Sequence, residues 1–204
     1  MGIVVSGEMI GELKSLSSWE DNLEKKLAVT GILTRAFLAN ELPAPIVVGG
    51  TAVAVYTKGL YSTVDLDLIS GNTEEVNEIM SAFGFKKAGK DYFHPEIDMY
   101  VEFPSRNLEG NLNMISEYIV DSTTDEIYII GLEDIILDRV ESFVSTNDLN
   151  SKEWAMRIMG GMYPHVDWSY LHKEAAERKV LSVLEKLQRE VKRYKDLYLE
   201  MKND

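Results

Sequence analysis

Hydrophobic positions change along the chain from a helical spacing to a strand spacing and back. Apolar residues near every third or fourth position in 19–42 predict a helix that Pro43 ends. The fully apolar run Ile46-Val47-Val48 predicts a short buried strand. Residues 63–69 and 97–103 alternate apolar and polar side chains, the spacing of strands with one buried face.

The remaining elements complete an α+β pattern. Further helices are predicted near 51–58, 73–83, 132–143, 152–162 and from 167 onward, and further strands near 92–93, 114–120 and 126–130. This order predicts a mixed sheet flanked by helices, followed by a helical C-terminal region. We expect an α/β core over 1–131, a helical extension packed on it over 132–178, and a C-terminal amphipathic helix over 179–204.

The C-terminal helix carries a narrow apolar seam. Its members are spaced alternately four and three residues apart: Val180, Leu184, Leu187, Val191, Tyr194, Tyr198 and Met201. Such a seam suits either a helix packed on its own domain or a coiled coil between two subunits. The highly charged remainder of the helix favours the coiled coil, so we expect a homo-oligomer, with a homodimer as its simplest form.

Composition limits the function classes. The 204 residues include no cysteine, which excludes disulfides and thiolate metal sites and favours a reducing cytoplasm. No apolar run approaches the roughly 18 residues of a membrane span, so no membrane role is expected.

The charge is unevenly distributed. The chain has a net charge of −13, yet residues 173–202 hold nine Lys or Arg and six Asp or Glu. That stretch is therefore +3, and the rest of the chain is −16. A body this acidic disfavours nucleic acid, except at the basic tail.

Two aspartates stand two positions apart in the predicted strand 63–69. Asp65 and Asp67 would project to the same side of a strand, where two close carboxylates repel each other. A divalent cation between them would relieve that repulsion, and carboxylate oxygens suit Mg²⁺. The alternative is two solvated aspartates on an exposed sheet face.

Gly49 and Gly50 lie between a predicted buried strand and a predicted helix. Glycines at this place let backbone N–H groups approach an anion, and a helix N-terminus adds a favourable dipole. Thr51 is the predicted cap of that helix and could add a hydroxyl contact. The alternative is an ordinary strand-to-helix turn, and neither a dinucleotide fingerprint nor a P-loop is present.

A third acid lies on another predicted strand. Asp98 and Glu102 both belong to the polar face of 97–103, and either could complete a carboxylate triad with the aspartate pair. Three acids that hold two metal ions, together with a glycine cradle for phosphates, would constitute a phosphoryl- or nucleotidyl-transfer site.

These motifs resemble the signature of the DNA polymerase β-like nucleotidyltransferase superfamily. The resemblance rests on Val47-Val48-Gly49-Gly50-Thr51 followed by Thr63-Val64-Asp65-Leu66-Asp67-Leu68. Tyr100-Val101-Glu102-Phe103-Pro104 and the helix 133–139 are similar to a bacterial and archaeal branch, some of whose members resemble toxin–antitoxin components. The resemblance covers about residues 20 to 175.

The resemblance implies transfer of a nucleoside monophosphate from a nucleoside triphosphate to an acceptor hydroxyl. It implies that Asp65, Asp67 and the third acid hold two Mg²⁺ ions, or Mn²⁺ in their place. The Phe-Pro context favours Glu102 over Asp98 as that third acid. The branch often has an arginine where this chain has Tyr61, which weakens the expectation of triphosphate binding. A non-catalytic module that acts through a protein partner is therefore the second interpretation.

Two basic residues are supporting candidates for phosphate contacts. Arg139 borders the apolar stripe of its predicted helix, where it could contact phosphate or pair internally with Glu133 or Asp134. Lys58 could reach the phosphates from the first predicted helix of the site, or it could be a solvated surface lysine.

Overall fold

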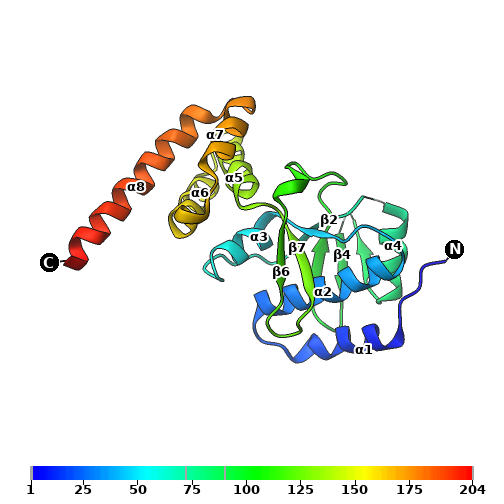
Figure 1. Cartoon of the computed structure of the whole chain (residues 1–204). Coiled ribbons are helices and arrows are strands. Elements are labelled where there is room, and N and C mark those ends of the chain that lie inside the picture. Colours follow the sequence, from blue (N-terminus) through cyan, green and yellow to red (C-terminus); the bar gives the residue numbers. More distant parts are fainter. Residues whose placement is uncertain (1, 72, 90, 204) are drawn as a thin grey trace. The chain divides into compact units, whose positions relative to one another are not determined.

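The computed structural model describes the backbone of residues 2–71, 73–89 and 91–203, and the side chains of these residues except Thr73 and 195–203. The chain divides into two units, Met1–Ile130 and Gly131–Asp204 (Figure 1). Each unit has its own set of buried apolar side chains.

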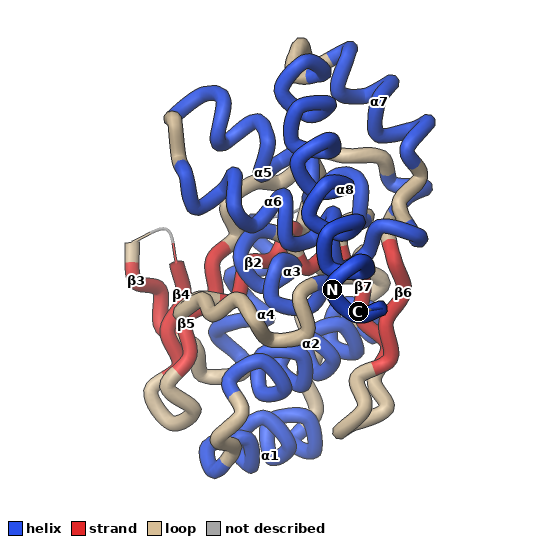
Figure 2. Tube along the Cα trace, turned by 90° about the vertical axis from the view of Figure 1, so that its left-hand side faces the viewer, coloured by secondary structure: helices blue, strands red, loops and turns tan. Residues whose placement is uncertain are grey.

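Within the described residues, seven strands form one mixed sheet in the first unit (Figure 2). The strands are β1 (Ile46–Val47), β2 (Leu66–Ile69), β3 (Lys86–Ala88), β4 (Asp91–His94), β5 (Met99–Glu102), β6 (Ser116–Ile119) and β7 (Glu126–Ile129). Their order across the sheet is β3-β4-β5-β2-β1-β7-β6. The pairs β1–β7 and β2–β5 are parallel, and the other neighbouring pairs are antiparallel. The predicted mixed α+β architecture is thus confirmed.

The described part of the first unit contains the α-helices α1 (Gly7–Ser15), α2 (Asn22–Ala39), α3 (Gly49–Tyr56) and α4 (Thr73–Ala82). The long helix α2 begins after Asp21, whose side chain accepts the backbone N–H of Glu24 at 3.0 Å. It ends before Glu41, which has the left-handed backbone conformation that often closes a helix. Helix α2 packs on β7 and α1 packs on α2, so α1 lies beyond α2 from the sheet (Figure 2).

The turn before β7 approaches α2 very closely at Gly31. A Cβ atom at Gly31 would lie 2.5 Å from the Cβ of Asp125, which is closer than real Cβ atoms come. The same aspartate forms an ion pair with Arg35 at 3.0 Å, and Arg35 also pairs with Glu12 of α1. One turn of α2 therefore holds both the β6–β7 hairpin and helix α1.

The second unit is helical: α5 (Leu132–Thr146), α6 (Leu149–Met162), α7 (Trp168–Glu177) and α8 (Leu181–Asn203). Two acids in the first turn of α5 are buried and paired. Asp134 accepts the Tyr170 hydroxyl at 2.9 Å and lies 3.7 Å from the Arg178 guanidinium, while Glu133 accepts the backbone N–H of Asp167 at 2.6 Å. Burial and the hydrogen bond to Asp134 raise the pKa of Tyr170. These contacts fasten α7 to α5.

The apolar seam of the C-terminal helix begins inside its own unit. Its first four members are buried, in the order Val180, Leu184, Leu187 and Val191. Helix α8 packs there against α6, α7 and α5. The next member, Tyr194, is 66% exposed, and the predicted members Tyr198 and Met201 lie outside the described side chains. No helix in the described residues combines the length and apolarity needed to cross a bilayer.

The Gly31 contact yields a stability prediction. Alanine usually stabilises a helix relative to glycine by about 1 kcal/mol, but Gly31→Ala forces its Cβ into Asp125. Overpacking of this kind costs about 1–3 kcal/mol. We expect a net loss of unfolding free energy, measured by urea denaturation.

Gly11→Ala in α1 is the matched control, because nothing lies within 4 Å of the Cβ it would add. We expect that variant to be neutral or stabilised. A Gly31→Ala protein as stable as Gly11→Ala would show that the hairpin does not constrain α2.

Candidate functional site

The turn between β1 and α3 requires glycine at the first residue of α3. Gly49 has a φ of +53°, a left-handed conformation that costs other residues about 1–2 kcal/mol. A Cβ there would also lie 2.8 Å from the Oδ2 of Asp67. The backbone of Gly49 is therefore pressed against the carboxylate of the second aspartate.

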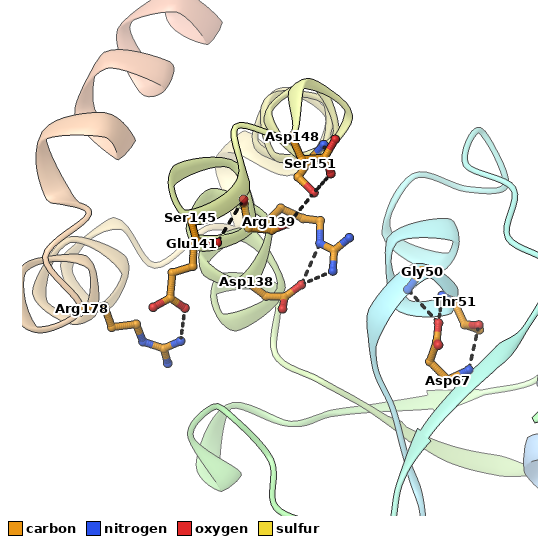
Figure 3. Close-up of polar contacts among 11 residues, drawn as sticks. Gly50, Thr51, Asp67, Asp138, Arg139, Glu141, Ser145, Asp148, Ser151 and Arg178 are labelled. Carbon is orange, nitrogen blue, oxygen red and sulfur yellow. Dashed lines mark hydrogen bonds and ion pairs between the residues drawn. The ribbon is translucent and has the colours of Figure 1, made fainter. Parts of the chain in front are cut away.

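That carboxylate caps the N-terminus of α3. The Oδ2 atom of Asp67 accepts the backbone N–H of Gly50 at 2.9 Å and that of Thr51 at 3.4 Å (Figure 3). The N–H groups at a helix N-terminus favour an anion, and here the anion belongs to the chain itself. The predicted glycine cradle is thus in direct contact with one of the predicted acids.

Thr51 does not cap α3, contrary to the sequence prediction. The helix starts two residues earlier, after Val48, and Thr51 lies inside its first turn, fully buried. Its hydroxyl donates to the backbone carbonyl of Asp65 at 3.1 Å and accepts the backbone N–H of Asp67 at 3.4 Å. Thr51 therefore fixes the backbone that carries both aspartates.

Asp65 lies in a bend before β2, not in a strand as predicted. The strand starts only at Leu66, and Val64 is 74% exposed although the alternation predicted it to be on the buried face with Leu66 and Leu68. The two aspartates remain neighbours because the Thr51 hydroxyl contacts the backbone of both.

The strand register separates the two candidates for the third acid. In the parallel pair β2–β5, Asp67 lies opposite Glu102. Asp98 lies in the turn before β5, with a positive φ of 47°. Four residues of extended chain, about 13 Å, separate it from Glu102. The structure brings Glu102 to the aspartate pair and leaves Asp98 at the other end of the strand.

The three acids act on one another electrostatically. Burial raises the pKa of Asp67, the N–H groups of Thr51 and Gly50 lower it, and the negative charges of Glu102 and Asp65 raise it further, so the net shift is upward. The three acids together therefore concentrate negative charge, and a cation would reduce their mutual repulsion.

The donor set fits a hard divalent cation, because all three acids offer oxygen atoms on adjoining segments. In the described residues, no group of three acidic, His or Cys side chains is already arranged as a metal site. One oxygen of Asp67 is bound to backbone N–H groups instead. A cation can therefore be held through the other oxygen of that carboxylate, Oδ1, while Oδ2 keeps its contacts with α3.

Lys26 is a site residue that the sequence prediction did not include. It belongs to α2, is only 2% exposed, and its Nζ donates to the backbone carbonyl of Thr63 at 2.6 Å. Burial lowers its pKa, while the negative charges of Asp67 and Asp65 raise it. The available signal was a lysine embedded in a long apolar helix, since buried lysines require a partner.

Tyr61 lies beside the glycine turn. A Cβ added to Gly50 would meet the Cε1 of Tyr61 at 3.1 Å and the side chain of Thr63 at 3.0 Å. An aromatic ring thus borders the backbone N–H groups where the resembled branch often has an arginine. The site has no guanidinium from this position.

The two supporting cations are placed differently. Lys58 is exposed just beyond the C-terminal end of α3, about 12 Å along the helix from Gly50, so it does not join the glycine cradle. Arg139 belongs to α5 in the second unit, where its Nε donates to Asp138 at 2.7 Å (Figure 3). Its partner is this neighbour, not Glu133 or Asp134.

Comparison with known proteins supports the fold. No family model and no curated protein sequence matches the chain. The solved structure of an antigenic nucleotidyltransferase-like protein from Paracoccidioides brasiliensis is similar, with a TM-score of 0.55 and 13% identity over 83% of this chain and 93% of that one. The antibiotic-resistance factor ANT(2'')-Ia aligns over 95% of this chain and 100% of its own, at 13% identity and a TM-score of 0.45.

The class of fold follows from these observations. The chain has a nucleotidyltransferase-like fold, with a mixed sheet flanked by helices and a helical C-terminal region.

The glycine turn provides a test of the site's geometry. We expect Gly49→Ala to lose about 1–3 kcal/mol of unfolding free energy, because the left-handed backbone and the contact with Asp67 both oppose a Cβ. Urea denaturation measures the loss.

Gly7→Ala is the control, since Gly7 also opens a helix but has no atom within 4 Å of an added Cβ. If Gly49→Ala and Gly7→Ala proved equally stable, the close approach of Gly49 to Asp67 would be wrong.

Proposed function

We propose that this protein is a Mg²⁺-dependent nucleotidyltransferase, which moves a nucleoside monophosphate from a nucleoside triphosphate to an acceptor hydroxyl. The observation that supports this proposal most is the convergence of Asp67 with Glu102 on one side and with the Gly50 N–H group on the other. Acids for cations and backbone donors for phosphate are the two components that such a reaction requires.

In this proposal, Asp65, Asp67 and Glu102 hold the cations, two Mg²⁺ ions or Mn²⁺ during the reaction. Ions held by these acids would supply positive charge against the phosphates of the triphosphate. The N–H groups of Gly50 and Thr51, which contact Asp67 in the structure, then bind phosphate oxygens. Glu102 accepts the proton of the acceptor hydroxyl. The hydroxyl oxygen bonds to the α-phosphorus of the triphosphate, and pyrophosphate leaves.

Removal of the aspartate carboxylates tests this function. We expect isothermal titration to detect binding of at least one of ATP, CTP, GTP and UTP to the wild type in millimolar Mg²⁺. Asp65→Asn and Asp67→Asn should each weaken that binding at least tenfold, because each removes a ligand charge.

Asp98→Asn is the matched control, since Asp98 lies at the far end of β5 and should bind nucleotide like the wild type. Failure of every triphosphate to bind the wild type would contradict the enzymatic proposal.

A second candidate function is a non-catalytic module that acts through a protein partner, such as a toxin–antitoxin component. The Tyr61 ring beside Gly50 favours it, because no arginine from this position serves the phosphates. Purification from the native host and mass spectrometry would identify a partner. Under this alternative, an Asp65→Asn/Asp67→Asn double variant keeps its biological effect. The enzymatic proposal expects the effect to be lost.

We also propose that the end of α8 joins two copies of the chain. The seam residues through Val191 are buried within their own unit and Tyr194 is 66% exposed, so the proposed contact with a second copy begins at Tyr194. An alternative role for this tail is to bind an RNA acceptor through the basic residues of 173–202. A steep salt dependence of RNA binding would support that role.

Truncation after Arg193 tests the oligomer. We expect a monomer by light scattering, with the thermal unfolding of the helical unit retained because its buried seam residues remain. Truncation after Lys179 is the contrasting variant, and it should destabilise that unit by removing Leu184 and Leu187. If truncation after Arg193 left the molar mass of the assembly unchanged, this interface would be ruled out.

A further inference from the structure

We infer that Lys26 is a counter-ion of the acid group, which consists of Asp65, Asp67 and Glu102. Its positive charge limits the protein to one bound divalent cation when no nucleotide is present. This inference rests on the proposed function, because it concerns the same three acids. It adds a positioning residue from α2, an element outside the sequence motifs.

The position of the ammonium group supports a role beyond packing. Lys26 is 2% exposed, and lysine is almost never so buried without a partner. Its Nζ donates to the Thr63 carbonyl, two residues before Asp65, and Asn22 donates to the same carbonyl at 3.4 Å. A carbonyl satisfies one donor of an ammonium but does not neutralise its charge.

The neutralising charges are the aspartates. Burial lowers the pKa of Lys26, and the negative charges of Asp67 and Asp65 raise it by a smaller amount. A cation taken from water into a protein is stabilised only by such opposite charges close by. Helix α2 therefore contributes one positive charge to the acid group. Unlike a metal ion, this charge belongs to a side chain and cannot dissociate.

Charge balance sets the number of resident metal ions. When all are ionised, the three carboxylates of Asp65, Asp67 and Glu102 carry −3, and a protonated Lys26 reduces this to −2. One divalent cation balances that charge. The triphosphate would supply further oxygen ligands for the second ion of the proposed reaction.

The hydrogen bond and the charge of Lys26 can be separated experimentally. Lys26→Gln retains an N–H donor, on a side chain shorter by one carbon, and removes the positive charge. Lys25→Met is the matched control, because Lys25 is also buried on α2 and its loss changes the net charge equally. Circular dichroism establishes that each variant is folded.

Mn²⁺ titration of the nucleotide-free chain, by calorimetry and electron paramagnetic resonance, provides the first readout. We expect one ion per wild-type chain, and the same in Lys25→Met. Lys26→Gln should bind Mn²⁺ more tightly, on the order of tenfold, or take a second ion, because a competing positive charge is gone. A merely structural lysine would weaken binding or leave it unchanged. Two ions in the wild type, or identical binding in Lys26→Gln, would overturn the inference.

A metal-free readout separates this inference from the proposed function. Urea unfolding is measured with a chelator present. Asp67→Asn should raise the urea midpoint more in the Lys26→Gln background than in the wild type, because only in the wild type does the substitution also remove the partner charge of Lys26. Additive shifts would overturn the counter-ion role even if Mn²⁺ binds. Coupled shifts without Mn²⁺ binding in any variant would establish the counter-ion and refute both the single resident ion and the metal-dependent function.

Discussion

The hydrogen bond from the Gly50 backbone to the Asp67 carboxylate joins the main parts of the site. It connects the N-terminus of α3 to the strand β2, and it requires that Gly49 take a left-handed conformation with no side chain. Asp67 is in turn fixed opposite Glu102 by the parallel pairing of β2 with β5. The Asp67 carboxylate thus joins the helix start to β2, strand pairing adds Glu102, and the Thr51 hydroxyl adds the backbone of Asp65.

Much of the fold could be predicted because the apolar pattern is strong where an element has one buried face. The segments around Ile46–Val47 and Met99–Glu102 were predicted close to their observed bounds. The strand Lys86–Ala88 was not predicted, because all three residues are exposed at the sheet edge and show no alternation. Val64 followed the alternation but lies in a bend, since the Thr51 hydroxyl, not a neighbouring strand, fixes the backbone there.

The site was predictable only as far as short motifs extend. Gly49, Gly50, Asp65 and Asp67 stand within 19 residues of one another, so their spacing in the sequence indicated a common place. The choice between Glu102 and Asp98 required the register of β2 against β5, which no single strand reveals. Lys26 comes from a helix that precedes the motifs by more than 20 residues, and only the tertiary packing shows where its side chain ends.

The close approach of Gly31 to Asp125 has a consequence for sequence divergence. The two positions lie 94 residues apart in the chain but share a space too small for one more carbon atom. A side chain at position 31 is therefore compatible only with glycine or a displaced turn at position 125, and glycine there removes one of the acidic partners of Arg35. Among diverging relatives, these three positions should co-vary as a set, even where the Gly-Gly and Asp-x-Asp motifs do not change.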